Sequence, residues 1–308
     1  MTALPYLDEA TLARLVPWPD AVGCLESALL DGLRPEAALP RSVHGLDHGQ
    51  LLLMPAQSPS AAGVKLSTVA PGNPGRGLPR VQALFVLFEH HTLRPVALVD
   101  GTALTTLRTP AVSAVAVKHL AAPDAGRLVV FGSGPQAWGH AHAITAVRPV
   151  RSVAVVARDA GRAASLADRL TAEGIPAGVG TASEVEDADV VACATTARTP
   201  LFDGRLLPEH ACVVAVGSHE PEARELDETV FARAQRVVVE TPGAALAEAG
   251  DVVAAVAAGA VAAEGLVALA DAVRMEPAPG ISVFKSVGMG WQDLVVAEVA
   301  HRRWLADE

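Results

Sequence analysis

A glycine-rich turn after a short apolar run is the first place where this chain could hold a phosphate. Residues 127–131 have the pattern of a buried strand, and the next six read Gly132-Ser133-Gly134-Pro135-Gln136-Ala137, the spacing GxGxxA, at the start of a helical pattern. Here Gly132 permits a tight turn, Gly134 lets the backbone approach a pyrophosphate, and Ala137 allows close packing of helix on strand. Because the turn lies among five predicted strands, it predicts a dinucleotide site.

A second candidate binding segment follows the next predicted strand, residues 152–156. The adenosine ribose of a dinucleotide would lie there. Sites that prefer NAD usually place an acid there, whereas this chain has Ala157-Arg158-Asp159. The guanidinium of Arg158 offers a planar set of donors to a 2′-phosphate, which an acid would repel. The sequence therefore favours NADPH. NADH stays possible because Asp159 could bind the ribose in a register shifted by one, and Arg158 could also be a solvated surface residue.

Three cations in the first part of the chain stand where their charge is costly. Lys65 lies inside an apolar strand pattern, Arg108 opens an apolar helix, and Arg41 lies beside a turn. A buried charge without a partner is expensive, so each needs an anion. One shared anionic ligand would satisfy all three. The alternative, which spacing alone favours, is that each pairs with a nearby Asp or Glu.

The composition limits the partners. With 308 residues the chain is long enough for two domains that each bury a core, and 51% of its residues are apolar and 4% aromatic, as is common in parallel α/β proteins. The formal net charge of −10 argues against a nucleic acid or an anionic membrane as partner. Acidic residues interrupt the Ala/Val-rich residues 244–273, so we expect a helical segment there and no membrane span.

Cysteine and histidine usage indicates a reduced compartment and no metal. Three cysteines are widely spaced and lack a CxxC or Cys/His ligand pattern, so we expect reduced, buried thiols: Cys24, Cys193 and Cys212. The histidines at 90–91 and at 140 and 142 have no ligand context either. Since the N-terminus also lacks the features of a secretory signal, we expect a cytoplasmic protein.

The pattern of predicted helices and strands changes after about the first hundred residues. The first hundred residues predict an α+β module, with helices over residues 8–15 and 20–30 and strands over 50–54, 63–69, 81–88 and 95–99. A helix over 102–120 leads into strands over 128–131, 152–156, 190–194, 212–216 and 236–239, with a helix over 160–170. This alternation predicts an α/β fold with a Rossmann-type doubly wound parallel sheet. Residues 282–286 and a helix over 292–304 are expected to pack back on the first module.

Five segments, in order, resemble the ornithine cyclodeaminase/μ-crystallin family over nearly the whole chain. They are Gly63-Val64-Lys65, residues 108–114, the GSGPQA turn, residues 216–218 through 224–226, and residues 284–289. Each segment alone is weakly specific, whereas five in order are strong. The resemblance implies a homodimer. It also implies an α+β substrate-binding and dimerisation domain, residues 1–118 with 282–308, and a dinucleotide-binding Rossmann domain, residues 119–281.

The resemblance implies roles for particular residues. Arg41, Lys65 and Arg108 match the positions that hold the substrate carboxylate, with Met54 beside them. Lys65 and His219 are the candidates for handling the proton, although a neutral or purely structural His219, or a bound water, is an alternative. The expected cofactor-binding residues come from the turn and from loops after strands: Thr109, Gly132, Ser133, Gly134, Pro135, Gln136, Ala157, Arg158, Asp159, Thr195, Thr196, Val216, Gly217, Ser218 and Ser286.

Two departures from the cyclodeaminase pattern point to the imine-reductase branch of the family. Cyclodeaminases have a catalytic aspartate where this chain has His219 and a glutamate near Leu52, where it is apolar. The local sequences are closer to the μ-crystallin branch, which resembles NADPH-dependent ketimine reductases. We therefore expect NAD(P)H-dependent reduction of an imine of an α-keto acid, such as Δ1-pyrroline-2-carboxylate or Δ1-piperideine-2-carboxylate. The alternatives are an ornithine or lysine cyclodeaminase with bound NAD, an amino-acid dehydrogenase, and a non-catalytic, crystallin-like NADPH-binding protein.

Overall fold

The computed structural model describes residues 4–276 and 278–307, and the chain divides into two compact units. Unit 1 comprises the described residues up to Ala28, then Arg34–Arg108 and the chain from Met289 onward, and unit 2 comprises Leu29–Leu33 and Thr109–Gly288. The division falls inside one helix, α3 (Gly101–Leu120), so that Arg108 and Thr109 belong to different units.

Unit 1 is built on a six-stranded mixed sheet of order β1-β6-β5-β4-β3-β2, antiparallel except for the parallel pair β1–β6. Its strands are β1 (Tyr6–Leu7), β2 (Ser42–Leu46), β3 (Gly49–Gln57), β4 (Ala61–Val69), β5 (Val81–Glu89) and β6 (Pro95–Asp100). Its helices are α1 (Glu9–Leu15), most of α2 (Trp18–Leu30), the first part of α3, and α10 (Gly290–Asp307), with 3-10 turns at Pro35–Ala37 and Pro74–Arg76.

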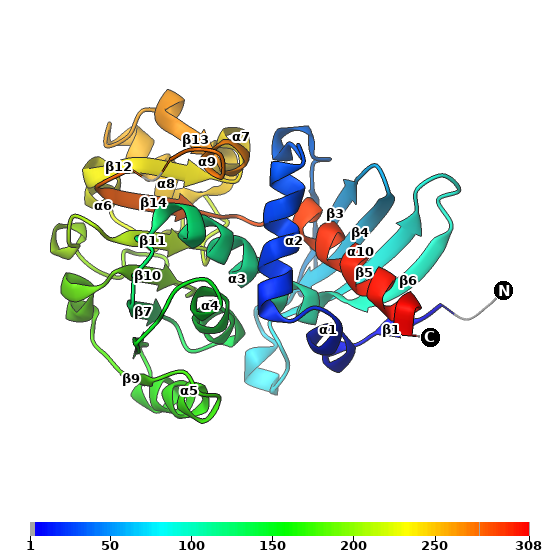
Figure 1. The fold of residues 1–308 in the computed structure, drawn as a ribbon, viewed down its shortest axis with the longest axis horizontal. Helices are drawn as coiled ribbons and strands as arrows, with labels where there is room; N and C mark the ends of the chain where they lie inside the picture. The colour runs from blue at the N-terminus through cyan, green and yellow to red at the C-terminus, as the bar shows by residue number, and fades with distance from the viewer. Residues whose placement is uncertain (1–3, 277, 308) are drawn as a thin grey trace. The chain divides into compact units, whose positions relative to one another are not determined.

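One face of this sheet is covered by α10. Buried and half-buried positions alternate along β3, β4 and β5, as strands with one covered face require, and α10 packs across these strands (Figure 1). The register places Met54, Lys65 and Phe85 side by side on three neighbouring strands. At the start of α10, a Cβ on Gly290 would come within 2.8 Å of the Pro55 carbonyl oxygen. A glycine therefore lets the N-terminus of α10 lie close to the strands.

Unit 2 contains an eight-stranded, wholly parallel sheet of order β13-β12-β14-β11-β10-β7-β8-β9. Its strands are β7 (Arg127–Phe131), β8 (Ser152–Val156), β9 (Ala177–Val179), β10 (Val190–Cys193), β11 (Cys212–Ala215), β12 (Ala234–Val239), β13 (Leu266–Ala268) and β14 (Ile281–Lys285). Its helices, besides the second part of α3, are α4 (Pro135–Thr145), α5 (Ala160–Ala172), α6 (Glu228–Arg233), α7 (Pro242–Glu248), α8 (Gly250–Ala257) and α9 (Leu269–Ala272), with 3-10 turns at Ala182–Asp187, Gly204–Leu206 and Ala263–Gly265.

The central strands of unit 2 are buried on both faces, as their continuous Val/Ala-rich sequences require. On one face Phe131, Val191 and Val213 share an apolar core with Phe231 of α6 and Val252 of α8. Within the sheet, β8 and β9 follow outward from one edge of β7, and β10 and β11 follow outward from its other edge. The strand order therefore reverses between β7 and β10, where open parallel sheets bind ligands at the carboxyl ends of their strands.

Most of the predicted helices and strands are confirmed to within a few residues, and the doubly wound parallel sheet is confirmed as well. One prediction is wrong. The first domain was expected to comprise residues 1–118 and 282–308, but residues 109–118 and 282–288 belong to unit 2, where 281–285 form β14 between β11 and β12 in the parallel sheet. The following helix α10 does pack on unit 1.

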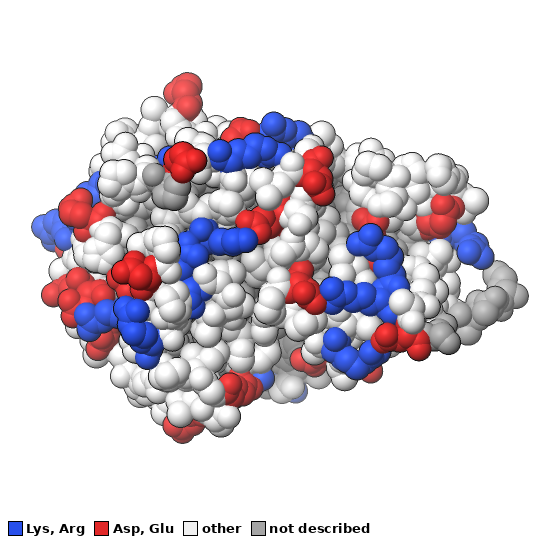
Figure 2. All heavy atoms as spheres, viewed as in Figure 1, with Lys and Arg blue, Asp and Glu red and all other residues white. Residues whose placement is uncertain are grey.

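Charged side chains are spread over the visible surface, and the Ala/Val-rich segment is divided among several short elements. Figure 2 shows positive and negative side chains interspersed over the face in view. Residues 244–273 form parts of α7 and then α8, β13 and α9 rather than one long helix. Within the described part of the chain, no helix combines the length and hydropathy that a membrane span requires.

Candidate functional site

Lys65 is a fully buried ammonium on β4 in unit 1. Its Nζ contacts both oxygens of Asp293, at 2.9 Å to Oδ1 and 2.8 Å to Oδ2, and donates to Thr105 Oγ1 at 3.1 Å. Burial and then the charge of Arg108 lower the pKa of Lys65 to about 8, while Asp293 acts in the opposite direction. An ammonium with this pKa can donate a proton near neutral pH.

Arg108 joins the same cluster from α3. Its Nε donates to Asp293 Oδ1 at 3.3 Å and its Nη1 donates to Gln292 Oε1 at 2.6 Å. The start of α3 is fixed by Asp100, whose carboxylate accepts hydrogen bonds from the first-turn N–H groups of residues 102 and 103. The start of α10 supplies Gln292 and Asp293. The first half of α3, the start of α10 and the middle of β4 thus meet at one cluster, which we call the Lys65 cluster: Lys65, Thr105, Arg108, Gln292 and Asp293.

The Lys65 cluster carries more positive than negative charge. Arg41 lies near enough for its charge to lower the pKa of Lys65 as well. Lys65 and Arg108 therefore pair with a protein acid, as one of the two alternatives for the cations predicts, and within the cluster these two cations share one carboxylate. Met54, the cross-strand neighbour of Lys65, is buried beside it.

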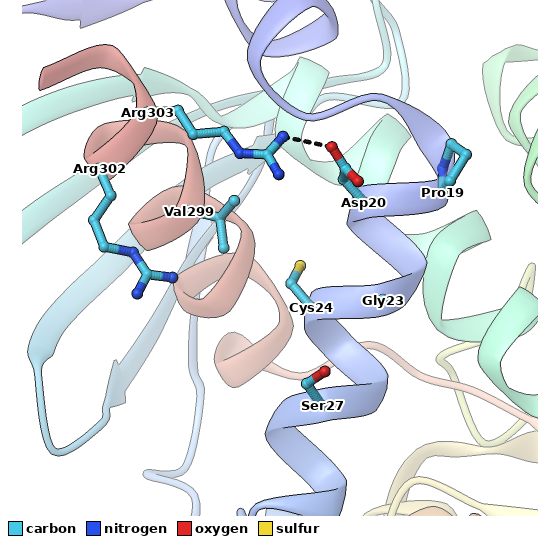
Figure 3. A pocket seen from close by; sticks show the side chains of 8 residues that line it. All are labelled: Pro19, Asp20, Gly23, Cys24, Ser27, Val299, Arg302 and Arg303. Atoms are coloured by element: carbon cyan, nitrogen blue, oxygen red, sulfur yellow. Dashed lines mark hydrogen bonds and ion pairs between the residues drawn. The ribbon is translucent and has the colours of Figure 1, made fainter. Parts of the chain in front are cut away.

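A hollow of about 380 Å³ lies between α2 and α10, further along α10 than the Lys65 cluster. Figure 3 shows Arg303 reaching from α10 to Asp20 on α2, where the two side chains form an ion pair of 2.5 Å. The Cys24 thiol donates to the Ala21 carbonyl at 3.3 Å, and burial raises its pKa to about 11. The Cys24 thiol stays protonated at neutral pH, whereas Lys65 has a pKa of about 8, so the Lys65 cluster is the stronger candidate for chemistry.

In unit 2 the GSGPQA turn has the geometry that a dinucleotide needs. Gly132 has a φ of 121°, and a Cβ there would lie 2.5 Å from the Ala194 carbonyl oxygen, so only glycine fits. Gly134 caps the N-terminus of α4, and a Cβ there would meet open space. Ala137 is fully buried, in line with helix–strand packing. The turn therefore leaves room for a phosphate at a helix N-terminus.

The helix that follows this turn is anchored by a buried histidine. His140 Nδ1 lies 2.7 Å from the Gln136 carbonyl oxygen, and its Nε2 lies 3.0 Å from Ser113 Oγ on α3. The carbonyl can only accept, so Nδ1 carries the proton and Nε2 accepts from the serine hydroxyl. Burial lowers the pKa of His140 to about 4, so the ring is neutral at physiological pH. His140 therefore joins α4 to α3.

The two charged residues after β8 differ in what their side chains contact. Asp159 caps α5, accepting a hydrogen bond from the Arg162 backbone N–H at 3.0 Å. The neighbouring Arg158 side chain is exposed, and Ala157 is half-buried. The Asp159 carboxylate is thus committed in part to the helix, whereas the Arg158 guanidinium is accessible to a phosphate.

Several hydroxyls predicted to bind the cofactor are held by the protein itself. Thr195 Oγ1 donates to Glu225 Oε1 at 2.7 Å, and the Ser218 hydroxyl donates to the Ala223 carbonyl. Ser286 Oγ donates to Glu240 Oε1 at 2.9 Å, and the same carboxylate accepts from the backbone N–H groups of residues 287 and 288. Buried acids therefore fix these loops.

The remaining predicted residues occupy the expected loops or helix. His219 and Thr196 are exposed in the loops after β11 and β10, Val216 is half-buried, and Thr109 is buried on α3. Ser133 and Gln136 are half-buried and Pro135 is exposed in the GSGPQA turn. Within residues 4–276 and 278–307, no three His, Cys, Asp or Glu side chains gather as a metal site would require.

Sequence reasoning missed six buried polar residues: Glu225, Glu240, Asp251, Lys285, Gln292 and Asp293. A signal existed for two of them. Lys285 interrupts an apolar strand pattern just as Lys65 does, and Asp251 interrupts an Ala/Val-rich run. Among the others, Glu225 stands close to charged residues, where nothing in the local pattern indicates burial.

The comparisons with known proteins agree with this architecture. Over 263 residues the chain is 36% identical to a Δ1-pyrroline-2-carboxylate reductase of Bacillus cereus, covering 82% of this chain and 81% of that protein. The structure of Thermococcus litoralis Δ1-pyrroline-2-carboxylate reductase in complex with NADH and L-proline matches with a TM-score of 0.92 at 28% identity, covering 99% and 98% of the two chains. An archaeal alanine dehydrogenase dimer with bound NAD matches with a TM-score of 0.90 at 27% identity, covering 99% and 97%.

The sequence model of one family describes most of the chain. The model of the ornithine cyclodeaminase/mu-crystallin family matches residues 33–308, which include the Lys65 cluster and the GSGPQA turn. With this match and a relative 36% identical over most of its length, the chain belongs to the ornithine cyclodeaminase/mu-crystallin family.

Proposed function

We propose that the chain is an NAD(P)H-dependent reductase of imines of α-keto acids, with Δ1-pyrroline-2-carboxylate and Δ1-piperideine-2-carboxylate as the substrate type. The observation that carries the proposal is the Lys65 cluster, in which buried positive charge exceeds negative charge around a lysine with a pKa of about 8. Relatives support it: two bear the name Δ1-pyrroline-2-carboxylate reductase, and the structure of one of them is a complex with NADH and L-proline. L-Proline is what reduction of that imine yields.

In unit 1, Arg41 and Arg108 would bind the substrate carboxylate through charge-assisted hydrogen bonds. Lys65 would donate a proton to the imine nitrogen, because only the protonated imine accepts hydride readily. Asp293 and Thr105 hold the Lys65 Nζ in place for this step. Asp293 also keeps the pKa of Lys65 from falling further, so the ammonium remains available near neutral pH.

In unit 2, the GSGPQA turn would bind the pyrophosphate of the dinucleotide and Arg158 its 2′-phosphate. A nicotinamide cofactor, when bound, supplies the hydride for the reduction. The open space at Gly134 and the uncapped N–H groups at the start of α4 fit a phosphate. NADH is the alternative, since two relatives of known structure carry NADH or NAD.

The direct test is NADPH oxidation measured against a panel of cyclic imines. Rapid oxidation with Δ1-pyrroline-2-carboxylate or Δ1-piperideine-2-carboxylate is expected. Ammonia release from ornithine with NAD would indicate a cyclodeaminase instead, and oxidation of alanine with NAD would indicate an amino-acid dehydrogenase. A chain that binds NADPH but leaves every imine unreduced would contradict the proposal and favour a crystallin-like binding protein.

Arg158→Ala is expected to weaken NADPH binding by about tenfold or more while leaving NADH binding within about twofold. The guanidinium is exposed after β8 and would lose a charge-assisted contact with the 2′-phosphate, which NADH lacks. Dissociation constants measured by cofactor fluorescence for both nucleotides check this. Arg151→Ala is the matched control, since its exposed guanidinium precedes β8 and binds the Asp124 carbonyl. Equal losses for NADPH and NADH would refute the assignment.

We further propose a cytoplasmic homodimer, formed through the second face of the unit 1 sheet. The three cysteines are free thiols, in line with a reducing compartment. The sheet face opposite α10 carries a row of apolar side chains that are partly exposed in the single chain, and the register aligns them: Pro55, Val64, Val86 and Leu98. An apolar face of this kind is typical of obligate interfaces, and one relative of known structure is a dimer.

Val86→Lys is expected to convert the dimer into a monomer. A lysine in the middle of the row Pro55, Val64, Val86 and Leu98 would bury unpaired charges in an isologous interface. Light scattering after size-exclusion chromatography at micromolar concentration measures the mass. Leu305→Lys, at an exposed position on α10, serves as the control and should leave the mass unchanged. A wild-type monomer, or a Val86→Lys dimer, would count against this interface.

A further inference from the structure

Glu225, Asp251 and Lys285 are almost completely buried in unit 2 and contact one another in series. Their exposed fractions are 0%, 1% and 1%. Asp251 pairs with Lys285 Nζ at 2.9 Å, and its Oδ1 accepts from the backbone N–H of Glu225 at 2.6 Å. We call these three residues the Glu225 network. None of them belongs to the GSGPQA turn or to the Lys65 cluster.

The Glu225 carboxylate ties together the exits of two adjacent parallel strands. Its Oε1 accepts from both the backbone N–H and the hydroxyl of Thr195, each at 2.7 Å, just beyond β10. Its Oε2 accepts from the Gly217 N–H at 2.7 Å, just beyond β11. A Cβ on Gly217 would lie 2.0 Å from the Thr195 carbonyl oxygen, so the two loops are in direct contact. One side chain therefore sets the spacing of both loops.

Asp251 and Lys285 add further hydrogen bonds that hold Glu225 and the loop after β11. The Asp251 carboxylate accepts from the N–H groups of Glu225 and Leu226, at 2.6 and 2.9 Å, and so holds the backbone that carries the Glu225 side chain. Lys285, at the end of β14, donates to the Ser218 carbonyl at 2.8 Å. The loop after β11 is thus held at both Gly217 and Ser218.

Burying three charged groups costs desolvation free energy, so the Glu225 network is not explained by a gain in stability. Two carboxylates accompany one ammonium, and burial raises the pKa of Glu225 while Lys285 and the donors at Thr195 and Gly217 act in the opposite direction. Replacing buried ionic groups by apolar residues is often neutral or stabilising. What apolar residues cannot do is accept directed hydrogen bonds from particular loop N–H groups. The network supplies positional precision.

The order of the strands indicates which part of a bound dinucleotide would lie at the loops after β10 and β11. Arg158 follows β8 on one side of β7, and the loops held by the Glu225 network follow β10 and β11 on its other side. A dinucleotide with its pyrophosphate at the turn after β7 and its 2′-phosphate at Arg158 has only the β10 and β11 side left for the nicotinamide ring. We infer that the Glu225 network is a positioning device for the nicotinamide ring of the cofactor. This inference rests on the proposed function.

The test compares two ligands that differ only in the nicotinamide ring, NADPH and 2′-phospho-ADP-ribose, on Glu225→Gln. The amide oxygen can still accept from Thr195, but the amide NH₂ would face the Gly217 N–H, so the loop after β11 loses its acceptor. The Kd for NADPH is expected to rise about tenfold, and that for 2′-phospho-ADP-ribose to stay within about twofold. Both constants come from titration calorimetry on the full chain. A variant that merely destabilises the unit would weaken both ligands equally.

The control is Glu228→Gln, whose carboxylate is partly exposed and pairs with Arg224; both constants should equal those of the wild type. If Glu225→Gln lacks cooperative thermal unfolding, Asp251→Asn tests the network from its other end. It keeps an oxygen for the Glu225 N–H and removes the charge facing Lys285, and it should weaken NADPH alone by about threefold or more. Equal or absent effects on the two ligands overturn the inference. A wild type that binds neither ligand contradicts the proposed function instead.

Discussion

Lys65→Met is expected to lower kcat for a cyclic imine by about 10²–10⁴-fold, the usual contribution of a general acid. The thioether fills a similar volume beside Met54 and Phe85, but it has no proton to give. In the wild type, kcat/KM should be constant at low pH and fall as pH rises through about 8, because the ammonium of Lys65 must be protonated to act. Initial rates of NADPH oxidation over a range of pH measure both effects.

The matched control for this prediction is Lys118→Met, which removes an exposed lysine of α3 and should leave both the rate and the pH profile unchanged. A Lys65→Met variant that keeps the wild-type rate and its decline above pH 8 would show that another group donates the proton. His219, exposed after β11, would then be the next residue to test.

Asp293→Asn is expected to lower the free energy of unfolding by about 3 kcal/mol, because Lys65 and Arg108 would be left buried without a counter-charge. It should also move the decline of kcat/KM to lower pH. Asp293 raises the pKa of Lys65, so its removal lets that pKa fall below about 8. Urea unfolding at pH 7 measures the first effect and the pH profile of NADPH oxidation measures the second.

Asp307→Asn provides the comparison, since Asp307 pairs with Arg14 at the surface and should contribute less than about 1 kcal/mol. Equal stability losses for the two variants would mean that the Lys65 cluster is not held by Asp293. An unchanged pH profile in Asp293→Asn would separate Asp293 from the proton-donating step.

The sequence was most informative where a local pattern has one physical cause. The strand-turn-helix at residues 127–137 predicts its own structure, because Gly132 and the buried strand before it act on near neighbours. Lys65 could be singled out because an ammonium in an apolar strand is expensive. Its partner Asp293 could not, since the two lie 228 positions apart and nothing local to Asp293 indicates burial.

The placement of β14 shows a different limit. Residues 281–285, Ile-Ser-Val-Phe-Lys, are all buried, and such a short, mostly apolar sequence would suit any strand in the interior of the sheet. Only the pairing with β11 and β12 reveals its position. The edge strand β2 was missed for the opposite reason: all five of its residues are exposed, so it lacks the alternation that marks a half-buried strand.

The central position of β14 has a consequence for the synthesis of the chain. Until residues 281–285 have left the ribosome, β11 and β12 have no partner between them, and the parallel sheet consists of two fragments with unpaired edges. The helix that covers the unit 1 sheet, α10, is translated later still. Both units must therefore complete their folding after most of the chain has been made, and a nascent chain stopped before residue 281 would present open strand edges to chaperones and to other chains.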